Sequence, residues 1–340
     1  MRWAVIVAGG SGSRFWPLSS PRLPKQLLAL TGPTSTAEAT LDRLLRIVDR
    51  NRILLVTGPD LAGPIGGRLG LPKENVLVEP EAKSTGPALA WAAHEAGRRD
   101  PEAVVLSSHA DWHVPDADGF VRLATRAFDL ALRTETLVTV GIVPTRPETG
   151  YGYIVPGAPF DGAQRVAQFR EKPAEAVAAD LIAGGALWNS GLFAWRASVV
   201  LSQFRRFTPE IAPGLDLLDQ GDVAGFFRVA RPVSIDIGLL ERSPDVAVLH
   251  GDFAWDDVGN WEALARVLPA DDAGNVLVGN VTPIDSQRVI AWSAGIPIVV
   301  AGLSNLVVVE ANGRILIMAR DRAPDLKAIL DRLPPGVREI

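Results

Sequence analysis

The chain has no cysteine, and it is poor in lysine, methionine and tyrosine. The lack of cysteine excludes disulfides and thiolate metal sites, and it fits a cytoplasmic protein without proving one. No hydrophobic run approaches the roughly 18 residues needed to cross a bilayer. The apolar start at residues 3–8 is too short for a signal peptide and runs directly into glycines. We therefore expect no membrane association.

The charge balance is also informative. A net charge of -5 argues against a nucleic-acid-binding protein, which usually presents a basic face. An acidic protein that binds an anion must do so through a few placed cations, with or without a metal. Of the 34 basic residues only five are lysines, namely Lys25, Lys73, Lys83, Lys172 and Lys327. This scarcity makes the position of each lysine informative.

Strands and helices alternate along the first 150 residues, and the pattern becomes more mixed after that. The run at residues 1–8 is continuously apolar, as in a strand buried on both faces of a parallel sheet. Further strands are expected at 52–57, 103–107, 136–143, 151–155, 165–171 and 191–195. Helices are expected at 37–48, 87–97, 119–133, 174–183 and 215–229. This alternation predicts a doubly wound α/β sheet with right-handed crossovers.

The texture of the sequence changes after about residue 271, where short β-rich pieces follow one another. Asn312 and Gly313, between the apolar runs 306–310 and 314–318, are a strong hairpin signal. A last helix is expected at 324–333. We predict a large α/β domain at residues 1–265 and a small β-rich domain at residues 266–340.

The stretch AGGSGSRFWPLSSPRLPK follows the first strand and predicts a phosphate-binding loop. It is not a dinucleotide fingerprint, because Phe15 stands where the third glycine belongs, and no GK[ST] follows to make a P-loop. Gly9, Gly10 and Gly12 leave backbone N–H groups open to an anion, and Arg14 offers a planar fork for phosphate oxygens. A tight glycine turn without a ligand is the alternative. One arginine and one scarce lysine, Lys25, in the same loop favour phosphate binding.

The longer stretch GGSGSRFWPLSSPRLPKQLLAL resembles the loop GGxGxRxxPLS…PKQ of the sugar-nucleotide pyrophosphorylases, a family of nucleotidyltransferases. The PKQ ending is most similar to the mannose-1-phosphate guanylyltransferase branch. The resemblance implies a Rossmann-like, GT-A-like mixed sheet with a small β-helix-like C-terminal domain. It implies that the loop, with Gly9, Gly10, Gly12 and Ser13, wraps a nucleoside triphosphate. Arg14 would then neutralise the departing pyrophosphate, and Lys25 would contact phosphate at the reacting centre.

The segment EPEAKSTGPALAWAA at residues 79–93 resembles the family's EPxxxNTAPAI segment, which lies against the base and ribose. The residues that the resemblance assigns to the nucleotide are Glu79, Ser84, Thr85 and Gly86. Ser84 stands where the family has asparagine, which leaves the choice of base open. The segment also reads as a helix N-terminus with Ser84 or Thr85 as the N-cap, and both interpretations can hold together.

Two segments resemble the metal-binding motifs of the family. LSSHADWHV at residues 106–114 is similar to its PADH-type segment, which implies that Asp111 binds Mg²⁺, although the spacing departs from the usual form. WDDVGNW at residues 255–261 is similar to WxDVGxW, which implies Asp257 as the second metal carboxylate. His109, Asp111 and His113 on an extended chain would instead place three transition-metal ligands on one side. Mg²⁺ is favoured, other divalent cations are allowed, and a contribution from His109 and His113 stays open.

Three further segments resemble the sugar-phosphate site: PETGYGYI, FREKP and WNSG, at residues 147–154, 169–173 and 188–191. The residues assigned through them are Gly152, Glu171, Lys172 and Asn189, with Lys172 pairing with the sugar's phosphate. Without the resemblance, Glu171 and Lys172 would read as a solvated pair at a strand end. SIDIGLLERS at residues 234–243 is similar to SIDYxVMEKS and adds Asp236 and Glu241 near the substrate.

The resemblance implies a reaction of GTP with α-D-mannose 1-phosphate, in which the sugar phosphate attacks the α-phosphorus in line, with Mg²⁺. The products are GDP-mannose and diphosphate. One alternative is a related enzyme that uses glucose 1-phosphate with dTTP or UTP. Another is a non-catalytic regulatory subunit, which would be expected to lose Arg14, Lys25 or a metal aspartate. A GT-A glycosyltransferase would show a DxD motif and lack the opening loop. Small β-rich terminal domains often pack between subunits, which favours a homodimer without establishing one.

Overall fold

The computed structural model describes residues 1–10 and 12–338. The contacts within the chain divide it into two compact units. The first unit comprises residues 1–9, 40–110 and 114–255, and the second comprises residues 10–39, 111–113 and 256–340. None of the described helices is both long enough and apolar enough to span a membrane.

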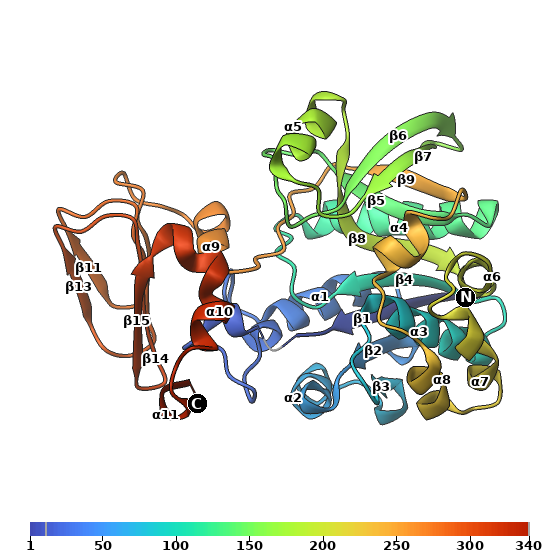
Figure 1. The fold of residues 1–340 in the computed structure, drawn as a ribbon, viewed down its shortest axis with the longest axis horizontal. Coiled ribbons are helices and arrows are strands. Elements are labelled where there is room, and N and C mark those ends of the chain that lie inside the picture. Colours follow the sequence, from blue (N-terminus) through green and yellow to red (C-terminus); the bar gives the residue numbers. More distant parts are fainter. Residues whose placement is uncertain (11, 339–340) are drawn as a thin grey trace. The chain divides into compact units, whose positions relative to one another are not determined.

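The first unit is built on a nine-stranded mixed sheet in the order β3-β2-β1-β4-β8-β5-β9-β7-β6 (Figure 1). The strands are β1 (Arg2–Ala8), β2 (Ile53–Thr57), β3 (Val76–Val78), β4 (Val104–His109), β5 (Leu137–Ile142), β6 (Tyr153–Phe160), β7 (Ala163–Arg170), β8 (Leu187–Arg196) and β9 (Val246–Gly251). Strands β1 to β4 run parallel, whereas β8 runs antiparallel to both β4 and β5. The predicted mixed α/β sheet is therefore confirmed.

The helices around this sheet lie against its strands or against one another. They are α1 (Thr36–Leu45), α2 (Pro59–Leu69), α3 (Thr85–Arg99), α4 (Ala117–Thr134), α5 (Glu175–Ala183), α6 (Ala197–Phe207), α7 (Leu215–Asp219) and α8 (Val223–Val229). Strand β1 is buried from Trp3 to Ala8, as its continuous apolar run predicted. The single helix predicted at 215–229 is wrong. It is broken into α7 and α8 at Gly221, which has a left-handed φ of 80°.

The second unit contains a small β-helix-like domain. Its strands are β10 (Val276–Val278), β11 (Val281–Ile284), β12 (Ile290–Ser293), β13 (Ile298–Ala301), β14 (Leu306–Ala311) and β15 (Arg314–Ala319), and its helices are α9 (Trp261–Val267), α10 (Leu326–Leu330) and α11 (Pro335–Arg338). The strands β10, β12 and β14 stack in parallel, as do β11 and β13. The predicted hairpin joins β14 to β15, with positive φ at both Asn312 and Gly313.

Residues 10–39 belong to this second unit because their apolar side chains enter its core. Phe15 is fully buried and meets the ring of Trp261 edge-on at 5.2 Å, and the Trp261 indole N–H donates to the carbonyl of Trp16 at 3.2 Å. The compact units thus group the opening loop with the C-terminal residues. The boundary between domains at residues 265 and 266 stays a prediction.

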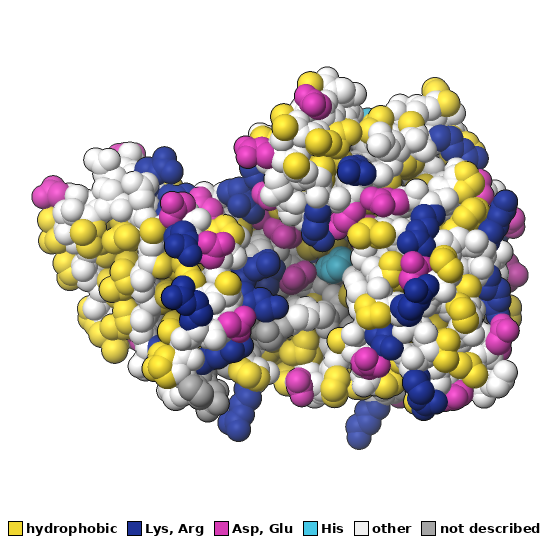
Figure 2. Space-filling view, in the orientation of Figure 1, with side chains coloured by type: hydrophobic (Ala, Val, Ile, Leu, Met, Phe, Trp, Pro, Cys, Tyr) yellow, Lys and Arg dark blue, Asp and Glu magenta, His cyan; other side chains and the backbone are white. Residues whose placement is uncertain are grey.

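The β-helix carries an exposed apolar surface. Ile284, Val299, Ile315 and Ile317 are between 50% and 65% exposed, and Figure 2 shows hydrophobic side chains gathered over β11 and β13. The homodimer stays a prediction.

Candidate active site

The glycine-rich loop follows β1 and has open space beside two of its glycines. Gly10 and Gly12 have φ angles of 79° and 64°, a region that side chains disfavour. Gly9 and Gly10 are exposed, and a Cβ on either would meet nothing within 4 Å. A ligand can therefore approach the backbone closely at these two residues.

Gly12 has a different role, because Lys25 packs directly against it. A Cβ on Gly12 would lie 2.8 Å from the backbone nitrogen of Lys25, and closer still to its Cβ. Two side chains hold the loop in this shape: the Ser19 hydroxyl donates to the Gly12 carbonyl at 2.8 Å, and the Gln26 amide donates to the Gly10 carbonyl at 3.3 Å. The second part of the motif thus closes over the first, and this fixes the backbone of Lys25.

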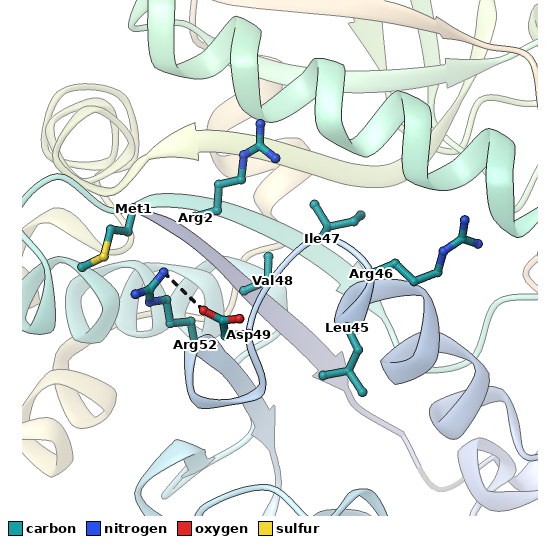
Figure 3. A pocket seen from close by; sticks show the side chains of 8 residues that line it. All are labelled: Met1, Arg2, Leu45, Arg46, Ile47, Val48, Asp49 and Arg52. Atoms are coloured by element: carbon teal, nitrogen blue, oxygen red, sulfur yellow. Dashed lines mark ion pairs between the residues drawn. The ribbon is translucent and has the colours of Figure 1, made fainter.

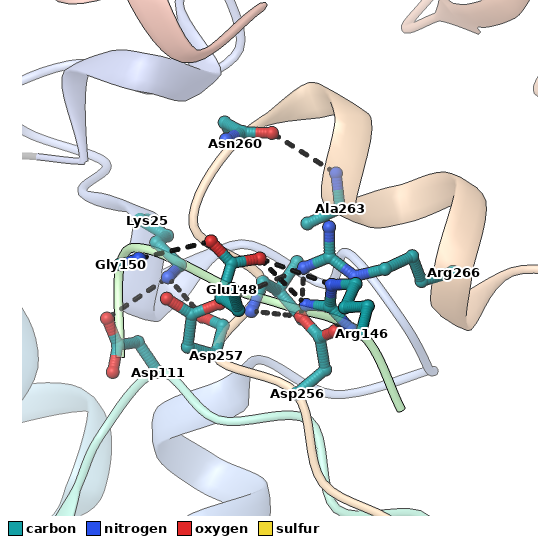
Figure 4. A network of polar contacts seen from close by, with 11 residues as sticks. Lys25, Asp111, Arg146, Glu148, Gly150, Asp256, Asp257, Asn260, Ala263 and Arg266 are labelled. Atoms are coloured by element: carbon teal, nitrogen blue, oxygen red, sulfur yellow. Dashed lines mark hydrogen bonds and ion pairs between the residues drawn. The ribbon is translucent and has the colours of Figure 1, made fainter. Parts of the chain in front are cut away.

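The side chain of Lys25 is almost fully buried and ends between two aspartates (Figure 4). Its ammonium donates to Oδ2 of Asp111 at 3.1 Å and to the backbone carbonyl of Asp257 at 2.8 Å. The Phe15 ring centroid lies 5.8 Å away. Three residues that the sequence assigned to phosphate and metal are therefore brought together.

The two neighbouring aspartates of WDDVGNW do different things. Asp256 is buried and accepts two hydrogen bonds from Arg266, at 2.7 and 2.8 Å, and one from the backbone N–H of Val258. The side chain of Asp257 is 41% exposed. Val258 is buried with φ of 43°, which is strained for a β-branched residue. Asp256 holds this strained turn, and the turn leaves the carboxylate of Asp257 accessible.

The donor set fits a hard divalent cation. Asp111 and Asp257 supply carboxylate oxygens, and Mg²⁺ is commonly held by one or two carboxylates together with substrate phosphates. The Lys25 ammonium stands beside them as a built-in cation. No three His, Asp or Glu side chains converge on one point within residues 1–10 and 12–338.

The extended H-x-D-x-H arrangement is not found. Strand β4 ends at His109, and the chain turns at Ala110 and Asp111. His113 then forms a backbone bridge with Asp256. Alternate side chains lie on one side only in an extended chain, so this turn prevents His109, Asp111 and His113 from forming a one-sided set of metal ligands. Arg14, in contrast, is exposed and makes no ion pair with any residue that the structure describes.

The residues assigned to the sugar phosphate lie in the first unit and form a cluster of their own. A Cβ on Gly152 would lie 2.7 Å from Oε2 of Glu171 and 3.2 Å from the Phe169 ring, so it would push the Glu171 carboxylate out of its place. Its carbonyl accepts from the backbone N–H of Asn189 at 2.8 Å. Lys172 is exposed, has φ of 44°, and donates to Glu171 at 2.7 Å. Gly152, Glu171, Lys172 and Asn189 are thus neighbours, as the motifs predicted.

Two residues next to this cluster were missed by sequence reasoning. Thr139 donates its hydroxyl to the amide oxygen of Asn189 at 3.1 Å, but it lies inside the apolar strand β5 and carries no local signal. Arg146 lies over the Trp188 ring at 4.9 Å and pairs with Glu148 at 3.0 Å (Figure 4). The aromatic residues of PETGYGYI and WNSG were a signal for a cation, because arginine stacks on such rings.

The residues assigned to the base lie at the end of β3 and at the start of α3. Burial raises the pKa of Glu79 to about 7, and its Oε1 atom is buried without a hydrogen-bond partner among the described residues. Ser84 is the N-cap residue of α3, but its side chain makes no capping hydrogen bond and its φ is 70°. The predicted N-cap position is confirmed, and the exposed Ser84 hydroxyl is not used for capping.

Thr85 and Gly86 face the protein. The Thr85 hydroxyl accepts from the backbone N–H of Ile235 at 3.0 Å, and the Gly86 N–H donates to the carbonyl of Val233 at 3.0 Å. A Cβ on Gly86 would lie 2.6 Å from that carbonyl oxygen. Gly86 is therefore required for packing, and its contact with a nucleotide stays a prediction.

A cavity of about 430 Å³ lies at the other end of β1 and is lined by Met1, Arg2, Leu45, Arg46, Ile47, Val48, Asp49 and Arg52 (Figure 3). Its arginines are already paired, Arg2 with Asp129, Arg46 with Asp118 and Arg52 with Asp49. Ligands of open α/β sheets bind at the carboxyl ends of the strands, so this cavity is not the candidate active site.

Comparison with known proteins agrees with this geometry. Residues 3–273 match the family model of nucleotidyl transferases, and residues 279–333 match that of the MannoseP isomerase/GMP-like beta-helix domain. The xanthan biosynthesis protein XanB of Xanthomonas campestris pv. campestris is 36% identical, over 98% of this chain and 73% of its own. A mannose-1-phosphate guanylyltransferase of Klebsiella pneumoniae is 34% identical, over 98% of this chain and 74% of its own. The crystal structure of mannose-1-phosphate geranyltransferase from Thermus thermophilus is similar with a TM-score of 0.91 at 32% identity, covering 97% and 98% of the two chains.

Proposed function

We propose, since this chain belongs to the nucleotidyl transferase family, that it is a mannose-1-phosphate guanylyltransferase. A phosphate oxygen of α-D-mannose 1-phosphate attacks the α-phosphorus of GTP, and the bond from that phosphorus to the bridging oxygen breaks. GDP-mannose forms and diphosphate leaves. The attacking oxygen is already anionic, so the reaction needs neither a general base nor a covalent enzyme intermediate.

The observation that carries this proposal is the placement of Lys25. Its ammonium is buried beside the carboxylate of Asp111 and the carbonyl of Asp257, at the end of a glycine-rich loop that has open space where side chains at Gly9 and Gly10 would lie. The barrier to phosphoryl transfer is mainly charge repulsion and alignment, which fixed cations address. A rigid buried lysine at a phosphate loop suits this chemistry.

Each part of the loop would meet a different portion of the triphosphate. Backbone N–H groups at Gly9, Gly10, Gly12 and Ser13 would donate to phosphate oxygens. Arg14 would take the leaving diphosphate, because its exposed guanidinium offers a bidentate fork. Lys25 would contact phosphate near the α-position.

A divalent cation would be held by Asp111 and Asp257, and Mg²⁺ is the ion we expect there. When bound, it would neutralise phosphate charge and polarise the phosphorus. Lys25 would remain the cation that the chain itself contributes, whatever the ion.

In the first unit, Lys172 would pair with the phosphate of mannose 1-phosphate, and Glu171 and Asn189 would bind sugar hydroxyls, with Gly152 keeping the space open.

For the nucleotide, Glu79 gives a chemical reason to expect guanine as the base. An ionised carboxylate only accepts hydrogen bonds, and guanine is the base that presents two adjacent donors, N1–H and the N2 amino group. Ser84 and Thr85 would lie on the same side of the nucleotide.

Two alternatives remain distinguishable. A related nucleotidyltransferase would use glucose 1-phosphate with dTTP or UTP. A regulatory subunit would bind nucleotide sugars without turnover. The presence of Arg14, Lys25, Asp111 and Asp257 together favours a working enzyme.

The test is diphosphate release with GTP, ATP, UTP and dTTP, each combined with mannose 1-phosphate and glucose 1-phosphate in the presence of Mg²⁺. We expect the highest kcat/KM with GTP and mannose 1-phosphate. Turnover with dTTP and glucose 1-phosphate, without turnover of the expected pair, would contradict the proposal. No turnover with any of the eight pairs, together with tight binding of GDP-mannose, would identify a regulatory subunit.

A further inference from the structure

The amide of Asn189 is held at both of its ends. Its Oδ1 atom accepts from the Thr139 hydroxyl at 3.1 Å and from the backbone N–H of Gly191 at 3.2 Å. Its Nδ2 atom donates to Oδ1 of Asp236 at 2.9 Å. A backbone N–H can only donate, so this network fixes which end of the amide is oxygen and which is nitrogen. One N–H of Asn189 is left to point elsewhere.

We propose that Asp236 is a positioning residue of the sugar-phosphate site, which acts by fixing the amide of Asn189. This inference rests on the proposed function, because it takes Asn189 as a contact for sugar hydroxyls. Asp236, Asn189 and Glu171 are each only partly buried, so the cluster keeps a surface that a ligand can reach.

The backbone around Asp236 is built to hold it in place. Asp236 begins a five-residue π-helical turn, Asp236–Leu240, and such turns are rare and frequently found at functional sites. The residue before it, Ile235, donates its N–H to the Thr85 hydroxyl at 3.0 Å. Within the turn, the Gly238 carbonyl accepts from the Thr208 hydroxyl at 2.6 Å. Side chains from outside the turn thus fix it on both sides of the Asp236 carboxyl.

The charges that face Asp236 come from the neighbouring strand ends. Burial and the carboxylate of Glu171 raise the pKa of Asp236 to about 7, whereas Lys172 and the Asn189 amide favour its ionised form. Glu241, at the end of the same turn, accepts from the backbone N–H of Glu171 at 2.9 Å. The hydrogen bond from Asn189 therefore goes to a carboxyl that changes charge near neutral pH, and it is strongest when that carboxyl is ionised.

The experiment combines kinetics with a signal that does not depend on turnover. Asp236→Ala removes the acceptor of Asn189, and Asp236→Asn keeps the size of the side chain but removes its charge. We expect Asp236→Ala to raise the KM for mannose 1-phosphate about 10-fold or more, and Asp236→Asn to raise it less. The KM for GTP should stay within about twofold. Asp216→Asn, an exposed aspartate of the same unit paired with Arg205, is the matched control.

The second readout is the side-chain amide signal of Asn189 in protein labelled with ¹⁵N-asparagine, assigned with Asn189→Asp. The chain has eight asparagines, so the spectrum is simple. In the wild-type protein this signal should shift with pH with a midpoint near 7, and in Asp236→Asn the shift should disappear. This measurement needs no substrate, so it tests the inference even if the proposed reaction fails.

The inference would be overturned by a folded Asp236→Ala protein whose KM for mannose 1-phosphate is unchanged and whose Asn189 amide signal keeps its wild-type position. If Asp236→Ala does not fold, Asp236→Asn and the wild-type titration decide the question. Lack of turnover in the wild-type protein would count against the proposed function alone.

Discussion

Lys25 Nζ donates to Oδ2 of Asp111 at 3.1 Å, although the two residues are 86 positions apart in the chain. The contact is largely buried on the lysine side, where 7% of the side chain is exposed, and more open on the aspartate side, where 28% is exposed. The ammonium of Lys25 is thus fixed inside the protein, whereas part of the Asp111 carboxylate stays accessible. Such an arrangement suits a lysine that serves an anionic ligand.

The first prediction concerns the charge of Lys25. Lys25→Met removes the ammonium but keeps much of the apolar stem, so we expect kcat to fall about 10²-fold to 10³-fold, as when a preorganised cation or donor is lost from a transition state. Lys25→Arg should not restore activity, because the larger planar group does not fit the same pocket. Lys327→Met, at an exposed lysine of the same unit, is the control. Retention of more than a third of the wild-type kcat in Lys25→Met would contradict the role.

The second prediction separates two glycines of the loop. Gly12→Ala must displace the backbone of Lys25, so we expect kcat to fall about 10²-fold. Gly10→Ala leaves Lys25 in place, costs about 1 kcal/mol of backbone strain and puts a Cβ where the phosphate approaches, so we expect it to raise the KM for GTP more than it lowers kcat. Steady-state kinetics and thermal unfolding of both variants are the measurement. Equal losses of kcat in the two variants would show that Gly12 does not act through Lys25.

The third prediction separates Asp256 from Asp257. Asp257→Asn should abolish turnover at ordinary Mg²⁺ concentrations and leave the Tm almost unchanged, because that carboxylate is half-exposed. Asp256→Asn removes the charge that Arg266 pairs with, which should cost about 1–2 kcal/mol of stability and lower the Tm by a few degrees. Its remaining activity at low temperature should exceed that of Asp257→Asn.

Removal of divalent ions with EDTA is the companion experiment for this pair. It should stop turnover in the wild-type protein, and added Mg²⁺ should restore it. If Asp257→Asn keeps a near-normal kcat, the assignment of Asp257 to the metal is wrong.

The strands of the first unit could be predicted because a short continuous apolar run is typical of a strand that is buried on both faces of a parallel sheet. The helix break at Gly221 was missed although the local signal was present, because Gly221 takes the left-handed conformation that ends helices and Asp222 caps α8 by accepting from the Gly225 N–H. The sequence also did not reveal that Asp256 is paired and Asp257 is accessible. This difference arises because Arg266 lies 2.7 Å from the carboxylate of Asp256 but 4.0 Å from that of Asp257.

In the candidate site, too, the motifs predicted which residues matter, and contacts between distant parts of the chain could not be predicted. The motif assigned Gly12 to phosphate, and the structure adds a steric reason for it, namely the backbone of Lys25. Thr139 and the tie between Thr85 and Ile235 were beyond prediction, because a single hydroxyl inside an apolar strand or at a helix start does not reveal its distant partner.

The last prediction concerns Glu79, whose pKa burial raises to about 7. The folded protein therefore holds a proton that the unfolded chain releases at about pH 4.3. Stability from this group is fully present below that pH and is lost as the pH rises towards 7. Glu79→Gln should remove this contribution to the pH dependence of the Tm, whereas Glu81→Gln, at an exposed neighbour, should not.

Guanine binding should act on the same proton. The N1–H and N2–H groups of guanine would donate to the ionised carboxylate of Glu79 and lower its pKa, so GTP binding at pH 7 should release about half a proton from this group. Calorimetry of GTP binding in buffers of different ionisation enthalpy measures this release. Glu79→Gln should abolish it and reduce the preference for GTP over ATP about 10-fold or more, and Glu81→Gln should leave both unchanged. Proton release that persists in Glu79→Gln would place the guanine contact on another residue.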